Sequence, residues 1–71
     1  MVWLVVHLVA TAVLTGVALA SLGVIYPAFA LVGAAEWPSY HAAHVRAITR
    51  VIVLPWVAQG VSTAALLLDP P

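Results

Sequence analysis

The sequence predicts an all-α membrane protein, an antiparallel hairpin of two transmembrane helices. Residues 1 to 35 and 51 to 68 contain no Asp, Glu, Lys or Arg, and 66% of the chain is hydrophobic against 6% charged. A soluble domain carries about 25% charged residues, whereas a helix that crosses a bilayer needs about 20 apolar residues. We therefore expect a single membrane domain over residues 1 to 71, surrounded by the lipid bilayer.

The first helix is expected over residues 2 to 26, and a turn over residues 27 to 37. The residue before a proline is pushed away from the helical region, so this helix should end or kink near Tyr26 and Pro27. One stripe of the helix is polar, with His7, Thr11 and Thr15 at helical spacing. Polar side chains in a membrane span usually face protein, so we expect this stripe to make interhelical hydrogen bonds.

The opposite side of the first helix carries small residues that permit close helix packing: Ala12, Gly16 and Ala20. The second helix also carries polar groups near mid-membrane that need partners: Gln59, Ser62 and Thr63. Both features indicate contacts with membrane helices outside this chain. We expect a homo-oligomer or a subunit of a larger complex.

The second helix is expected over residues 38 to 68. Pro38 suits the first helical position, where its missing N–H costs nothing, and Pro55 should bend the helix because it removes one backbone hydrogen bond. Arg46 and Arg50 lie toward the turn. Cytoplasmic ends of membrane helices carry the excess of Lys and Arg, so a cytoplasmic turn is preferred.

His41 and His44 are the candidate functional pair. On a helix they lie about 60° apart, on the stripe that Ile48 continues, whereas Arg46 and Arg50 point to nearly the opposite side. The histidines should therefore face another helix and the arginines the lipid headgroups.

Three roles for the pair stay open. The imidazoles could hydrogen-bond to Tyr40, to carbonyls of the turn or to interfacial water; they could ligate a metal or haem, with Glu36 as a third ligand; or they could transfer protons to or from a substrate. Two ligands do not make a closed metal site, so no metal or cofactor is assigned. The net charge is zero, which gives no indication of nucleic-acid binding.

The segment from residue 23 to residue 60 resembles the first half of small bacterial membrane proteins of the anthrone-oxygenase-like family. The resemblance rests on short, aromatic-rich motifs: Tyr26, Pro27, Phe29, Glu36, Trp37, Tyr40, His41, His44, Ile48 and Pro55. Members of that family are longer and are expected to form bundles of four membrane helices. The resemblance thus implies that this hairpin is half of such a bundle, in a bacterial inner membrane.

Fungal relatives in that family are linked to the cofactor-independent oxygenation of anthrones. The resemblance implies His41 and His44 as catalytic positions, with Tyr40 and Glu36 in support, acting on a flat hydrophobic substrate near the membrane interface. The alternative is a non-enzymatic small subunit of a larger membrane complex, with histidines that are structural or that ligate a haem or pigment.

Overall fold

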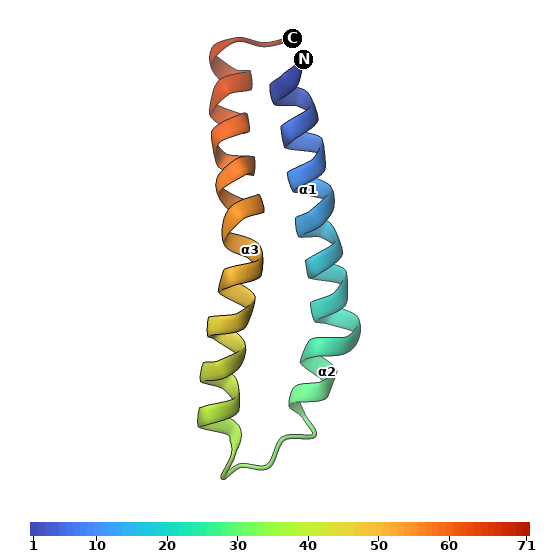
Figure 1. Cartoon of the computed structure of the whole chain (residues 1–71). Coiled ribbons are helices and arrows are strands. Elements are labelled where there is room, and N and C mark those ends of the chain that lie inside the picture. Colours follow the sequence, from blue (N-terminus) through green and yellow to red (C-terminus); the bar gives the residue numbers. More distant parts are fainter.

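The computed structural model describes residues 1–71 and is an all-α antiparallel hairpin, as the sequence predicts (Figure 1). The first arm contains α1 (Val2–Ala20), a π-helical turn η1 (Ser21–Ile25) and α2 (Tyr26–Phe29), which run on without a break. The second arm is α3 (Trp37–Leu68), and residues 30 to 36 form the loop. Both chain termini lie at the end opposite the loop.

Both arms are long and apolar enough to cross a membrane: Val2–Phe29 with 28 residues and Trp37–Leu68 with 32. The molecule measures 51 × 20 × 13 Å. A bilayer is about 40–45 Å thick with its headgroup regions, so the hairpin has the length to reach from one interface to the other. Of the 59 backbone hydrogen bonds, 51 lie within the helices, which is how a chain satisfies its backbone in lipid.

The first arm does not end at Tyr26, as expected, but continues to Phe29. The reason is the π-helical turn before Pro27, in which the N–H of Tyr26 donates to the carbonyl of Ser21, five residues back. Pro27 has no N–H to continue the α-helical ladder, and its ring crowds the carbonyl four residues earlier. A wider turn at this point accommodates the proline without ending the helix, as π-bulges do elsewhere.

The second arm begins at Trp37, with Pro38 in its first turn, close to the predicted start. Pro55 lies inside α3, which remains one uninterrupted helix from Trp37 to Leu68. The loop between the arms is therefore residues 30 to 36 rather than 27 to 37. The shorter loop brings Phe29 directly opposite the start of α3.

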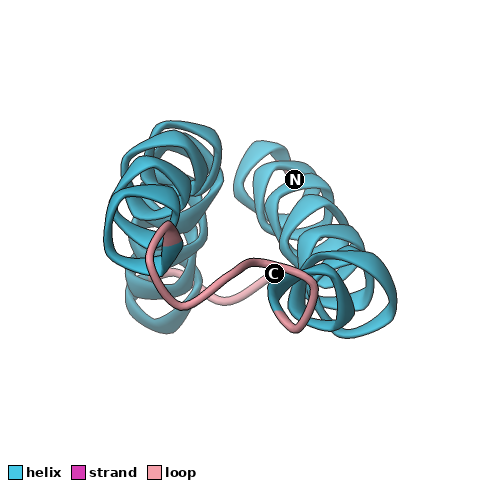
Figure 2. Cartoon of the chain, turned by 90° about the horizontal axis from the view of Figure 1, so that it is seen from below, coloured by secondary structure: helices cyan, strands magenta, loops and turns pink.

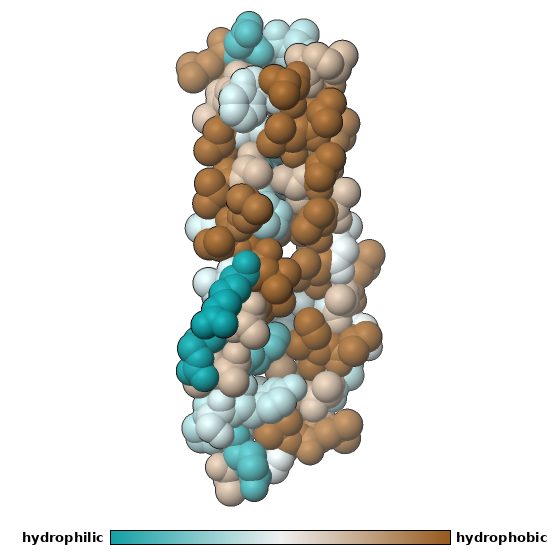
Figure 3. Space-filling view, viewed as in Figure 1, coloured by the Kyte–Doolittle hydropathy of each residue, from teal (hydrophilic) through white to brown (hydrophobic).

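The two arms share a single seam, as the view along the helices shows (Figure 2). Only Ala10 and Ser62 are buried, and most large apolar side chains are exposed. Brown, hydrophobic side chains accordingly cover much of the visible surface, above all in its upper part (Figure 3). The outer surface suits lipid or other membrane helices, and any site built within the chain must lie along the seam or in grooves beside it.

Candidate functional site

An aromatic cluster closes the seam at the loop end of the hairpin. Its centre is Phe29, at the end of α2, and the remaining members are Tyr26, Trp37, Tyr40, His41 and His44. The ring centroid of Phe29 lies 4.9 Å from that of His44 and 5.2 Å from that of Trp37, both in edge-to-face geometry. Such pairs are favourable because the positive edge of one ring meets the negative face of the other.

The two candidate histidines occupy different positions in this cluster. His44 is half-buried against Phe29, whereas His41 is exposed and stacks on Trp37 with centroids 5.0 Å apart. Neither imidazole hydrogen-bonds to another residue of the chain, so the bonds to Tyr40 or to carbonyls of the loop, which belonged to one of the three open roles, are not formed. The rings contribute flat surfaces to the packing.

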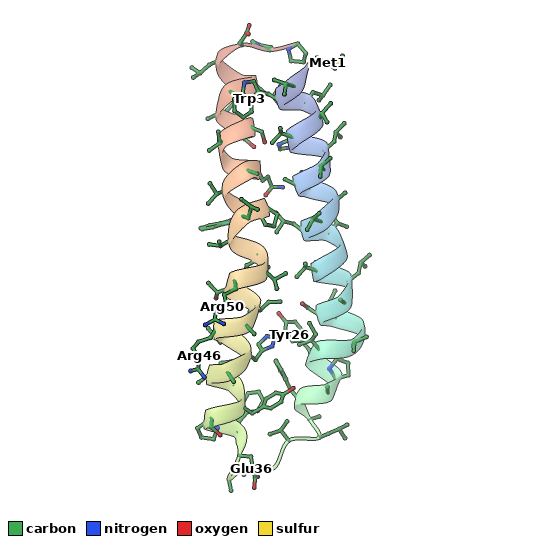
Figure 4. The ribbon with its side chains drawn as sticks, viewed as in Figure 1. Met1, Trp3, Tyr26, Glu36, Arg46 and Arg50 are labelled. Atoms are coloured by element: carbon green, nitrogen blue, oxygen red, sulfur yellow. The ribbon has the colours of Figure 1, made fainter.

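Glu36 is not brought into the pair. It is exposed, it precedes the first residue of α3, and its carboxylate folds over Gly33 in the loop. It makes no ion pair or hydrogen bond through its side chain, and no group of three His, Cys, Asp or Glu side chains comes together in the molecule. The structure therefore unites Tyr40, His41 and His44 of the predicted site, and leaves Glu36 apart at the tip (Figure 4).

The arginines lie as predicted from the helical spacing. Arg46 and Arg50 are exposed and point away from α1 (Figure 4), whereas His44 and Ile48 are half-buried at the seam. The most hydrophilic patch in Figure 3 lies on this flank of α3. An arginine there can extend along the helix toward headgroups while its stem covers apolar surface.

A polar cluster joins the two arms near the other end of the hairpin. Its members are His7, Thr11, Gln59, Ser62 and Thr63. The amide nitrogen of Gln59 donates to the hydroxyl of Thr11 at 3.0 Å, and Nδ1 of His7 lies 3.1 Å from the hydroxyl of Ser62. Ser62 is fully enclosed, so the seam contains a buried polar side chain.

The polar cluster corrects one expectation and confirms another. The expectation that Gln59, Ser62 and Thr63 need helices outside this chain is wrong, because their partners are His7 and Thr11 of the same chain. The expected interhelical bonding of the His7 stripe is confirmed, except that Thr15 bonds to the carbonyl of Thr11 in its own helix. The pairing of His7 with Ser62 depends on the register between the two arms, which the sequence pattern of each helix alone does not give.

The contacts of the polar cluster are compatible with a proton on Nδ1 of His7. The hydroxyls of Ser62 and Thr63 both donate to the carbonyl of Gln59, at 3.0 and 2.7 Å. Both also contact Nδ1 of His7, at 3.1 and 3.4 Å. A hydroxyl has one proton, so all four contacts are satisfied together only when Nδ1 carries a proton and shares it between the two oxygens.

Two grooves flank the seam, and neither lies at the aromatic cluster. The apolar groove, of about 490 Å³, is lined almost wholly by aliphatic side chains around Ala10 and Pro55. The His7 groove, of about 510 Å³, is lined by His7 and by the segment of α3 from Trp56 to Thr63. At the loop end the ring of Phe29 packs against the rings of Trp37, Tyr40 and His44.

Comparison of the chain with known protein families, with characterised proteins and with solved structures finds no match in any of the three.

Proposed function

We propose that the chain is a non-enzymatic small membrane subunit that packs against other membrane helices, with His41 and His44 in a structural role. The observation that carries this is the contrast between surface and seam. Apolar side chains are exposed on the outside of both arms, while the aromatic cluster is packed around Phe29 and adjoins neither groove. A packed cluster of rings holds the loop end together and offers no space for a substrate.

The face of α1 that carries Ala12, Gly16 and Ala20 is the proposed contact surface. All three residues are exposed, and a Cβ placed on Gly16 would meet nothing within 4 Å. Small residues at this spacing let two helix backbones approach closely, which is the main source of attraction between helices in lipid. The two arginines favour a bilayer orientation with the loop in the cytoplasm of a bacterial cell.

Replacing Gly16 with Leu tests this surface. The hairpin itself should form normally, because the space over Gly16 is open within the chain, but association with other helices should weaken. Energy transfer between labelled chains in lipid vesicles measures the association. Gly60→Leu on α3, where the space is also open, is the matched control and should associate like the native chain; equal association of all three proteins would contradict the proposal.

A second candidate function is the oxygenation of a flat hydrophobic substrate, and one observation favours it. Tyr40, His41 and His44 gather within about 6 Å of Phe29, with centroid distances of 5.9, 6.3 and 4.9 Å. A flat ring that displaced Phe29 would lie between a phenol and two imidazoles, and an imidazole is a suitable general base for an acidic C–H or a phenol.

Oxygen uptake with an anthrone distinguishes the two candidates. An enzyme should lose about a hundredfold or more of its rate in His44→Ala, because general bases contribute that much, and the His41→Ala variant should show whether the exposed ring takes part. A structural subunit should show no uptake above the buffer rate in any variant. A visible absorption spectrum of the purified protein tests the haem or pigment alternative, since a band lost in His44→Ala would identify a ligated chromophore.

A further inference from the structure

The geometry points to the His7 groove as a binding site for a neutral aromatic ring that carries a hydroxyl group, such as the head of a membrane quinol. The hydroxyl would donate to Nε2 of His7. This site lies on a different face from the proposed contact surface of α1 and goes beyond the proposed function.

The first step of the argument is the state of the His7 ring. The tautomer that the site requires carries its proton on Nδ1 of His7. The contacts are compatible with it, since the hydroxyls of Ser62 and Thr63 lie 3.1 and 3.4 Å from Nδ1 and are placed to give their own protons to the carbonyl of Gln59. In a neutral imidazole the other nitrogen then keeps its lone pair. A hydrogen bond that fixes the tautomer in this way also fixes the orientation of the ring, as it does for histidines that bind ligands.

The second step is that Nε2 is accessible and has no partner. Nε2 of His7 makes no hydrogen bond in the structure, and no buried side-chain nitrogen or oxygen lacks a partner. Nε2 therefore reaches the surface. His7 lies about 8 Å along the helix axis from Val2, below the end of the span, where an acceptor that faces hydrocarbon alone is unfavourable.

The third step concerns the chemistry of the groove that His7 lines. Gln59 also lines this groove. Its side-chain amide nitrogen is used for Thr11, and its side-chain oxygen is a second acceptor that makes no hydrogen bond within the chain. No charged side chain lines the groove. Two acceptors and no cation select a ligand that donates hydrogen bonds, and they disfavour carboxylates and phosphates.

The shape and lining of the groove select a ring. Trp56, Val57 and Val61 are among its lining residues, and Gly60 leaves open space above the backbone. A volume of about 510 Å³ lies within the range of about 300–1,000 Å³ usual for small-molecule sites. An ammonium donor would be costly at this depth, so the ligand that fits is a neutral, flat, hydroxyl-bearing ring.

The test uses tetramethylhydroquinone, kept reduced without oxygen, and the full chain in lipid nanodiscs. Two comparison probes share its ring and lack the donor: its dimethyl ether and the corresponding quinone. Side-chain nitrogen NMR of histidine follows binding, and His41 and His44 serve as internal controls. We expect Nε2 of His7 to shift on addition of the quinol alone, with binding about tenfold tighter than that of the ether, the gain of one added hydrogen bond.

Two variants make the test specific. His7→Asn keeps an N–H near the position of Nδ1 for the two hydroxyls but removes Nε2, so quinol binding should fall to the level of the ether. Gly60→Leu fills the groove from a position where nothing in the chain is displaced, and it should abolish binding of all three probes even if His7→Asn fails to fold. Three outcomes would overturn the site. The quinol does not bind, the quinol and the ether bind equally, or binding is unchanged in either folded variant.

Discussion

The two ends of the hairpin are held together by different interactions. At the loop end, rings from both arms pack around Phe29, and no side-chain hydrogen bond crosses the seam. Near the termini, Thr11 and His7 bond across the seam to Gln59 and Ser62, and Ser62 is the most enclosed residue of the chain. Aromatic rings gather at membrane interfaces, whereas hydrogen bonds and small side chains join helices within lipid.

Histidine shows the difference most clearly. His44 presents a ring edge to Phe29 and makes no hydrogen bond, whereas His7 makes its contacts through Nδ1. One residue type thus serves as a flat packing unit at one end and as an oriented polar group at the other. The position of a histidine in the hairpin thus decides whether it packs through its ring or hydrogen-bonds through a ring nitrogen.

Phe29→Ala should have the largest effect, because it removes the centre of the aromatic cluster. Phe29 is half-buried and contacts rings on both arms. Large-to-small changes of aromatic core residues cost about 3–5 kcal/mol, and for a half-buried ring we expect a loss of about 2 kcal/mol in the free energy of hairpin closure.

The chain has no cysteine, so this loss can be measured with dyes on cysteines introduced at two exposed positions, Leu19 and Val53. Energy transfer between them during titration with SDS reports separation of the arms. Leu31→Ala, in the loop and 89% exposed, is the matched control and should change the midpoint little. An equal change in both variants would show that the aromatic cluster does not hold the loop end.

Gln59→Leu should have a smaller effect on closure, measured in the same assay. It removes one hydrogen bond across the seam, to Thr11, and such bonds between membrane helices contribute about 0.6 kcal/mol on average, up to about 1.7 kcal/mol. The double-mutant cycle with Thr11→Val should give a coupling energy of about 0.6 kcal/mol. Thr49→Val, which loses only a bond to the carbonyl of Val45 in its own helix, should show no coupling to Gln59→Leu.

Much of this arrangement could be predicted from the sequence. Two uncharged runs predicted the helices, because this feature depends on composition alone. Helical spacing placed Arg46 outward and both histidines inward, and the inward placement holds for His44 but not for His41, which is exposed. The grouping of Tyr40 with His41 and His44 was implied by the family resemblance, and their gathering around Phe29 of the other arm was not predicted. The inferences from composition and spacing used a single helix at a time.

The remaining features depend on how two helices meet. The partners of Gln59 and Ser62 required the register of the hairpin, which is set by a loop that proved shorter than predicted. The side-chain direction of Glu36 depended on the loop conformation around Gly33. The helix was expected to end or kink near Pro27, and the π-helical turn before it was not predicted, although a wider turn relieves the same clash.

Pro27→Ala is the smallest perturbation and tests what joins the two ends. The substitution restores an N–H that can donate to the carbonyl of Gly23, so the turn Ser21–Ile25 should close from π to α geometry. Because the new hydrogen bond offsets the altered packing, we expect the free energy of closure to change by less than about 0.5 kcal/mol. Cα chemical shifts over residues 21 to 25 and a newly protected amide at position 27 report the change.

The geometric consequence should be larger than the energetic one. Closing the wide turn rotates α2 relative to α1, so Phe29 should turn away from His44 while the bonds of His7 and Thr11 stay in place. Ring-current shifts on His44 report whether Phe29 has turned away. The nitrogen chemical shifts of His7 report whether its hydrogen bonds stay in place. Pro38→Ala is the control, since a missing N–H at the first turn of a helix costs nothing. If the π-helical turn persists in Pro27→Ala, the prediction is wrong. Packing against α3, rather than the missing N–H of the proline, would then stabilise the turn.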